Sequence, residues 1–289
     1  MVLKTLGRTL AAAVAGVQVI MFASGAAGAV SKQSVVAAFY PVAYAVQRVG
    51  GDRVDVTNLT PAGAEPHDLE LTPDEIDEIL DASLVVDLGH GFQPAIEKAA
   101  EQRDGPTVSL LRAGTKDPHI WLDPVRMEAI VRTVQRELTR IDPKGRAEYA
   151  RNAERFLSDL AALNTRYAEG LASCRRKVIV TGHEAFGYLA QRYGLRQEGV
   201  AGLSPDAEPD AKRLGQLADL IKRLGVTVVY TEDLVSPRIA ETLAREAGVK
   251  TETLNPLEGL TDAELEHGAN YVTVMDQNLA KLRNGLGCS

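Results

Sequence analysis

The chain has 289 residues, of which 45% are hydrophobic and 25% are charged, and its formal net charge is −7. These proportions are typical of a soluble globular protein, and they exclude a disordered chain, a collagen-like repeat and a multi-span membrane protein. Two cysteines are too few for a disulfide-stabilised miniprotein or a cysteine-based zinc cluster. The acidic balance argues against a nucleic acid partner, because binding phosphates needs a basic surface.

The N-terminal residues 1–29 have the pattern of a cleaved secretion signal. Lys4 and Arg8 precede an apolar stretch over 10–23, and Ala27-Gly28-Ala29 supplies the small residues of a cleavage site. The alternative, a membrane anchor, is disfavoured because the stretch is short and rich in Ala and Gly. We therefore predict an exported, periplasmic protein, and we expect no lipid anchor because no cysteine lies near the predicted cleavage site.

Export would place the two cysteines, Cys174 and Cys288, in a compartment where disulfides persist. They could form one bridge that ties the C-terminal tail to the start of the second half. They could equally remain two unpaired thiols, and the sequence leaves both alternatives open.

Segments with strand character alternate along the chain with segments of helical character. The helical patterns include 73–82, which has an acidic start, and 211–224, whose apolar residues recur at helical spacing. Such alternation predicts an α/β fold with parallel sheets covered on both faces. The predicted strands are 34–40, 54–59, 84–88, 107–111, 178–181, 226–231 and 251–254.

The middle of the chain, 124–171, has no strand signal, and Pro143 divides it into two helical pieces. The second piece would be about 40 Å long at 1.5 Å per residue. We therefore predict two α/β lobes with parallel central sheets, joined by one long backbone helix, with a cleft between the lobes. The boundaries are a signal peptide over 1–29, an N-terminal lobe over 30–143, a connecting helix over 144–172 and a C-terminal lobe over 173–289.

Four of the five histidines follow predicted strands: His67, His90, His119 and His183. We expect His183 to open a helix, whereas His267 fits no such pattern. Ligands of open α/β sheets bind at the carboxyl ends of the strands, so facing lobes would bring these four imidazoles together. Imidazole is a common ligand of zinc and also suits copper, nickel and iron. Each histidine alone could equally be an ordinary loop residue.

Three stretches carry a resemblance to the zinc- and manganese-binding periplasmic proteins of ABC importers. They are GAEPHDLELTP over 63–73, DPHIWLDP over 117–124, and HEAFGYL over 183–189 with YGL over 193–195. Weaker similarities lie at 255–257 and 271–279, and the order of the stretches matches across nearly the whole mature chain. The resemblance implies two α/β lobes joined by one long helix, with the metal buried between them.

Carried over residue by residue, the resemblance implies that His67, His119 and His183 are metal ligands. It also implies a membrane permease with its ATPase as the partner, and the chain itself has no P-loop sequence. A periplasmic metallochaperone is a further partner to consider, and we expect a monomer. The protein would then capture Zn²⁺ and deliver it, rather than act as an enzyme.

The sequence departs from the family at the fourth ligand, where many relatives have a carboxylate and this chain has Asn255. The fourth place could fall to water or to Glu65, Asp68 or Glu258, and Asn255→Asp would then tighten zinc binding or leave it unchanged. His90 stands where relatives often carry Asn, which suggests a residue at the pocket rim. The His-rich insertion of many zinc-specific relatives is missing between the first two ligand histidines.

Several carboxylates are candidates for holding the imidazole tautomers. Asp68, Asp123 and Glu184 lie near the motifs, although each could instead be a helix cap or a surface charge. Glu232 and Asp233 end a predicted strand, and they could bond a histidine or simply be solvated.

Three imidazoles favour Zn²⁺ over Mn²⁺, which prefers oxygen ligands, so we predict zinc. A manganese-binding homologue is the alternative within the same class. A zinc hydrolase with Glu184 or Glu65 as base is an alternative of another class, because three histidines and a water form a catalytic zinc site. A haem or iron-chelate binder is disfavoured by the 5% aromatic content, and an envelope adhesin is a fourth hypothesis.

Overall fold

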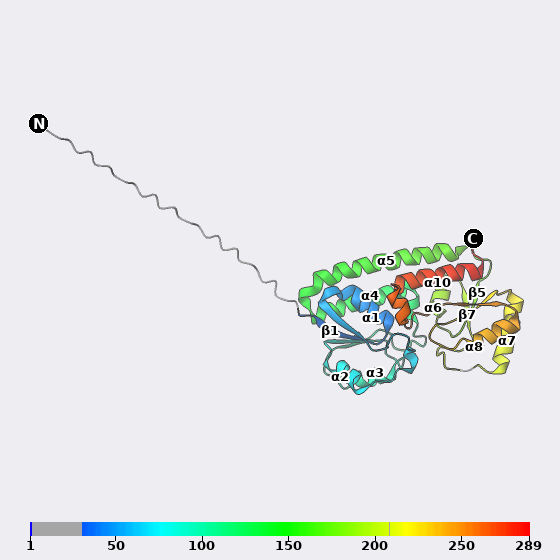
Figure 1. Cartoon of the computed structure of the whole chain (residues 1–289), viewed down its shortest axis with the longest axis horizontal. Coiled ribbons are helices and arrows are strands. Elements are labelled where there is room, and N and C mark those ends of the chain that lie inside the picture. The colour runs from blue at the N-terminus through cyan, green and yellow to red at the C-terminus, as the bar shows by residue number, and fades with distance from the viewer. Residues whose placement is uncertain (2–30, 208) are drawn as a thin grey trace. The chain divides into compact units, whose positions relative to one another are not determined.

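Two parallel four-stranded sheets and the helices that cover them form the fold of the computed structural model (Figure 1). The structure describes Met1, residues 31–207 and residues 209–289, so the predicted signal peptide lies, apart from Met1, outside the described residues. Within that described part, no helix combines the length and the apolar character needed to cross a bilayer. The predicted α/β class with two parallel sheets is confirmed.

The first sheet has the strand order β2-β1-β3-β4, and every neighbouring pair is parallel. Strand β1 is central, and its Val35 pairs with Val56 on one side and Leu84 on the other. All four residues of β3 are buried, as expected for a strand covered on both faces. The elements of this half are β1 (Gln33–Ala37), α1 (Tyr40–Gly50), η1 (Gly51–Arg53), β2 (Val54–Asn58), η2 (Pro66–Asp68), α2 (Pro73–Asp81), β3 (Leu84–Asp87), α3 (Pro94–Ala100), β4 (Thr107–Ser109), η3 (Ile120–Leu122) and α4 (Pro124–Ile141).

The second sheet repeats the same connection pattern in the order β6-β5-β7-β8, again with parallel pairs only. In both sheets the first strand is central and the chain moves to its two sides in turn. Such a switch leaves a crevice at the carboxyl edge, where ligands bind. The elements of this half are η4 (Pro143–Gly145), α5 (Arg146–Ala172), β5 (Val178–Thr181), α6 (Gly187–Arg192), β6 (Arg196–Gly199), α7 (Ala211–Leu224), β7 (Val228–Thr231), α8 (Arg238–Ala247), β8 (Lys250–Thr253), α9 (Asp262–Glu266) and α10 (Tyr271–Leu286).

The predicted connecting helix is α5, which has 27 residues and runs alongside both halves (Figure 1). It packs against α1 and α4 of the first half and against α10 of the second. Its buried face repeats at helical spacing, and the Tyr167 hydroxyl donates to the Met275 carbonyl of α10 at 2.7 Å. The lobe boundaries near residues 143 and 173 stay a prediction.

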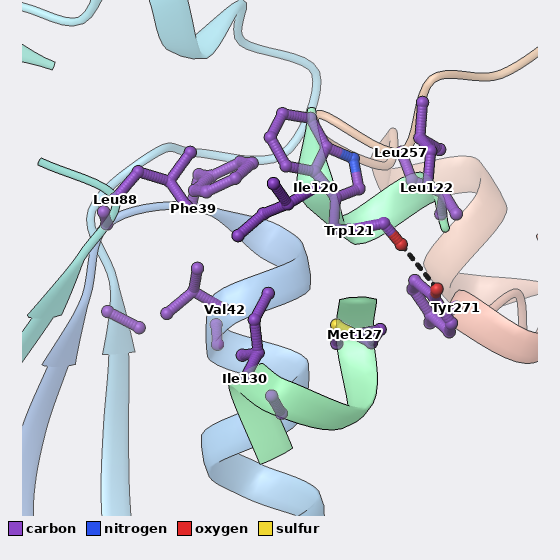
Figure 2. Close-up of a cluster of buried hydrophobic side chains, with 14 of the residues drawn as sticks. Phe39, Val42, Leu88, Ile120, Trp121, Leu122, Met127, Ile130, Leu257 and Tyr271 are labelled. Atoms are coloured by element: carbon purple, nitrogen blue, oxygen red, sulfur yellow. Dashed lines mark hydrogen bonds between the residues drawn. The ribbon is translucent and has the colours of Figure 1, made fainter. Parts of the chain in front are cut away.

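The two halves are also joined through Trp121, which lies in a buried cluster with Phe39 and Ile120 (Figure 2). The Tyr271 hydroxyl donates to the Trp121 carbonyl at 2.6 Å, and the Trp121 indole donates to the Pro256 carbonyl at 2.8 Å. Both partners belong to the second half. These bonds fix the segment that follows β4 against the segment that follows β8.

Three local features differ from expectation or settle an open alternative. The strand β6 has the sequence Arg-Gln-Glu-Gly and escaped prediction because a polar strand at a sheet edge has no apolar pattern. His183 does not open a helix, because bends and turns occupy residues 182–186 and α6 begins only at Gly187. Cys174 and Cys288 form a disulfide, which resolves the alternative in favour of the bridge.

Candidate metal centre

Four side chains from the carboxyl ends of both sheets converge on one point: His67, His119, His183 and Glu258. One ligand atom of each lies within 4.8 Å of all the others. The Glu258 Oε1 atom lies 3.3, 3.1 and 3.2 Å from the Nε2 atoms of His67, His119 and His183 in that order. The first two histidines come from the first half of the chain, and the other two residues come from the second.

These separations fit a four-coordinate cation. Zinc bonds to nitrogen and oxygen are about 2.0–2.2 Å long, which places neighbouring ligand atoms of a tetrahedron about 3.3–3.6 Å apart. The Nε2 atoms of His119 and His183 lie 3.3 Å apart, close to that edge. The types of these donor atoms and the separations between them therefore suit a zinc-sized ion.

His119 is held by Asp117, two residues earlier in the chain. The Asp117 Oδ1 atom accepts from the His119 backbone N–H at 3.0 Å and lies 2.8 Å from the ring Nδ1. A hydrogen on Nδ1 leaves the Nε2 lone pair directed at the other ligands, as metal binding requires. The side chain is fully buried, so water cannot compete for this nitrogen.

His183 is held in the same way by Glu232, which follows β7. The two Glu232 oxygens reach the His183 backbone N–H at 2.8 Å and the ring Nδ1 at 2.6 Å. The His183 carbonyl accepts from Gln197 at 2.9 Å, which fixes the backbone as well. Gly182 is needed here because a Cβ at this position would lie 2.5 Å from Glu232 Oε1. The sequence left open whether Glu232 bonds a histidine or is solvated, and the structure shows that it bonds His183.

Glu258 occupies the fourth place, and Asn255 does not. Asn255 instead shapes the turn: its Oδ1 accepts from the Leu257 backbone N–H at 2.7 Å. Leu257 has φ of 57°, which is unusual for a residue other than glycine, and this turn presents Glu258 to the centre.

Asn255 is itself held on both sides of its backbone. Asn278 accepts from the Asn255 backbone N–H at 3.1 Å and donates to the Asn255 carbonyl at 2.7 Å. The Asn255 amide donates to Asp233 and Glu264, at 3.1 Å in each case.

His67 is the one member of the group that keeps contact with solvent, because its side chain is 11% exposed and the other three are at most 1% exposed. It lies in η2, where the Glu65 carboxylate accepts from the His67 backbone N–H at 3.2 Å. Its ring packs edge-on against Phe92, with centroids 4.7 Å apart.

The electrostatics of the centre favour a positive charge between the ligands. Burial alone would favour neutral Glu258, but the three imidazoles outweigh burial and hold the pKa of Glu258 well below its usual range. Burial likewise opposes a charge on His183, yet Glu232 and Glu258 raise the pKa of His183 to about 10. Burial and the charge of Glu258 raise the pKa of Glu65 to about 8. Protons and a cation therefore compete for the same nitrogens.

Other residues from the sequence analysis lie outside the cluster. His90 is exposed and does not join the other three histidines, contrary to the expectation that all four would converge. His267 is exposed, and its Nδ1 lies 2.6 Å from the Ala263 carbonyl. Asp123 caps α4 through the Val125 backbone N–H at 3.0 Å, so Asp117 and not Asp123 holds His119.

An enclosed cation site, with two ligands from each half of a two-sheet fold braced by a long helix, defines a metal-binding protein of the two-lobed solute-binding class. Residues 35–285 match the family described as ZnuA, zinc-uptake complex component A, periplasmic. The chain belongs to this family.

Two curated relatives have zinc in their names. The chain is 36% identical over 280 residues to the high-affinity zinc uptake system protein ZnuA of Bacillus subtilis, covering 88% of each protein. It is 36% identical over 277 residues to the zinc-binding lipoprotein AdcA of Streptococcus pneumoniae, where the match covers 87% of this chain and 55% of AdcA. The chain thus spans about half the length of that relative.

Among solved structures, the Zn(II)-bound ZnuA-like domain of S. pneumoniae AdcA aligns with a TM-score of 0.77 and 37% identity. The alignment covers 89% of this chain and 99% of that domain. The likeness therefore extends over the whole described fold and not only over the histidine motifs.

Proposed function

We propose that this protein captures Zn²⁺ through His67, His119, His183 and Glu258 and delivers it to the membrane permease of an ABC importer. The observation that carries the proposal is the convergence of three Nε2 atoms on one buried carboxylate oxygen at 3.1–3.3 Å. When they are neutral, His119 and His183, whose Nδ1 atoms are bonded to Asp117 and Glu232, direct only Nε2 lone pairs at that oxygen. A cation between them turns this repulsion into coordination.

The ligand set favours zinc over the manganese alternative. Three imidazoles and one carboxylate suit a borderline-soft ion, whereas manganese and magnesium prefer oxygen ligands. The names of the relatives, which describe zinc uptake and zinc binding, support the same choice. Two of the imidazoles are oriented by bonds to carboxylates, so the site is organised before the ion arrives.

Binding and delivery are favoured over hydrolysis. A catalytic zinc keeps an open position for water, but here Glu258 fills the fourth position and is 1% exposed. The hydrolase alternative needed that position for a water and used Glu65 or Glu184 as the base. Membership of a family of zinc-uptake components also favours transport.

The remaining features of the proposal rest on the sequence and the relatives. The chain would be exported to the periplasm by its predicted signal peptide, act as a monomer, and draw on an ATPase in the permease complex. The expectation of no lipid anchor rests on the sequence alone, whereas the relative AdcA is named a lipoprotein. A periplasmic metallochaperone remains a further candidate partner. We place the lobes at 30–143 and 173–289 with the connecting helix between them.

The test is a competition titration against a chromogenic zinc chelator. Wild-type protein should bind one equivalent of zinc, and His119→Ala, His183→Ala and Glu258→Gln should each weaken binding at least about tenfold, since even the loss of a residue that only supports a ligand typically has that effect. His267→Ala removes an exposed imidazole that lies outside the ligand cluster and serves as the matched control. Wild-type affinity in any of the three ligand variants would contradict the assignment.

A further inference from the structure

The buried centre raises the question of how zinc reaches it. Of the four ligand side chains, only His67 is exposed to solvent, at 11%, so an incoming ion must meet it first. A cavity of about 160 Å³ leads to this ring. Its walls include His67, Phe92 and Pro118 from the first half and Leu203 and Ser204 from the second.

His90 lines the same cavity and is exposed to solvent. Among the side chains of that wall, only the two imidazoles are of a type that commonly binds zinc, because the other polar side chains are those of Lys116, Thr115 and Ser204. The cavity therefore joins one exposed imidazole at its rim to the one accessible imidazole of the centre.

The backbone at His90 is held in an unfavourable conformation. Gly89, His90 and Gly91 have φ of 75°, 58° and 82°, three successive residues in the left-handed region. This region suits glycine best and is uncommon for any other residue, histidine included, and unusual backbone of this kind gathers at functional sites. The Glu97 carboxylate accepts from the Gly91 backbone N–H at 2.8 Å and holds the loop in place.

The charge beneath this loop also suits a cation. The carboxylate of Asp87, which ends β3, is 2% exposed. Burial raises the pKa of Asp87 to about 6, and the nearby imidazole of His90 offsets part of that rise. In its ionised form this carboxylate attracts positive charge towards the loop.

We propose that His90 is a transient zinc ligand on the access route, which takes the ion from solvent and passes it through this cavity to His67. This inference rests on the proposed function, since it concerns how zinc reaches the same centre. In each exchange, one imidazole replaces one water of the ion, and the His90 bond breaks as the buried ligands close around the metal. Because His90 touches neither the free nor the fully bound ion at equilibrium, it changes the rates of binding and release but not their ratio.

A second cavity supplies the competing route. It is about 410 Å³ in volume and is lined by Glu65, Asp68 and Asp206, but by none of the four metal ligands. If acidic side chains guided the ion, neutralising Asp206 would slow binding and replacing His90 would not.

The experiment is stopped-flow zinc association and chelator-driven dissociation. Trp121 is the only tryptophan, and its ring centroid lies 5.1 Å from that of His119, so its fluorescence reports on the centre. The variants are His90→Asn, with His267→Asn as matched control and Asp206→Asn for the competing route. Asn tolerates the left-handed backbone better than most residues, so the first variant should fold.

We expect His90→Asn to lower both rate constants by about fivefold or more while Kd stays within about twofold, with both other variants unchanged. Three results would overturn the inference: wild-type rates in His90→Asn, slowing in Asp206→Asn alone, or faster release with a raised Kd, which would make His90 a ligand of the bound state. Wild-type stoichiometry and Kd come from the same data. A wild-type protein that fails to bind zinc would defeat the proposed function itself, and the inference with it.

Discussion

The substitution Asn255→Asp separates two accounts of the fourth ligand. If residue 255 occupied that position, an added carboxylate would tighten zinc binding or leave it unchanged. The structure gives Asn255 another role, because its amide donates to Asp233 and Glu264 at 3.1 Å each and its carbonyl oxygen shapes the turn before Glu258. An Asp here keeps the acceptor oxygen but replaces the donor by a third negative charge.

The loss of stability in Asn255→Asp can be estimated from the two hydrogen bonds that the Asn255 amide donates. A hydrogen bond to a charged group contributes about 1.5–3 kcal/mol, and solvent around the exposed Asp233 reduces its share. Repulsion between the carboxylates adds to the loss, and protonation relieves part of it. We expect Asn255→Asp to lower the free energy of unfolding of the metal-free protein by about 2–4 kcal/mol at pH 8. Zinc binding should weaken as well, because the turn positions Glu258.

The effect has a defined pH dependence. Neighbouring charges would raise the folded-state pKa of the new carboxyl above its unfolded value. A carboxyl with a raised folded-state pKa destabilises the fold at pH values where it is ionised. The free energy of unfolding of Asn255→Asp should therefore approach that of the wild type as the pH falls. The assay is urea unfolding at pH 5 and pH 8, with the exposed Gln102→Glu as control for the added charge. Equal stability of Asn255→Asp and wild type at pH 8, or tighter zinc binding, would refute the reasoning.

Three further predictions concern the centre and the fold. Glu232→Gln should weaken zinc binding about 10–100-fold, measured by chelator competition, because His183 loses the carboxylate that orients it. Zinc affinity should rise about tenfold per pH unit from pH 6 to 9, because the pKa of His183 is raised to about 10; a plateau above pH 7 would contradict this. Replacing Cys174 and Cys288 by serine should lower unfolding free energy by about 2–4 kcal/mol and leave Kd unchanged.

The sequence singled out His67, His119 and His183, which the structure brings into one cluster, because each follows a strand and each lies in a distinctive motif. Strands such as β5, at Val178–Thr181, were equally visible because apolar β-branched residues mark them. The long helix α5 could be predicted from one apolar face that persists after Pro143. Each of these patterns lies within a short segment of the chain, so it can be recognised without knowing the fold.

The sequence left the candidate for the fourth place open among water, Glu65, Asp68 and Glu258, because the position of each depends on backbone geometry. Glu258 reaches the centre only because Leu257 adopts a left-handed conformation that Asn255 supports, and nothing in the residue types distinguishes Glu258 from Glu65. The orienting role of Asp117 was missed although it lies inside a recognised motif, and its spacing of two residues from His119 was the available signal. The exposure of His90 likewise depends on the path of a glycine-flanked loop, which the residue types alone do not predict.

The central claim is that three imidazoles and the Glu258 carboxylate enclose one zinc ion between the two halves. The most direct test is a crystal structure of the zinc-loaded protein with anomalous data collected across the zinc absorption edge. We predict one zinc with the Nε2 atoms of His67, His119 and His183 at about 2.0–2.1 Å and a Glu258 oxygen at about 2.0–2.2 Å. Zinc bound elsewhere, or held with a water in the fourth place and Glu258 turned away, would contradict the account.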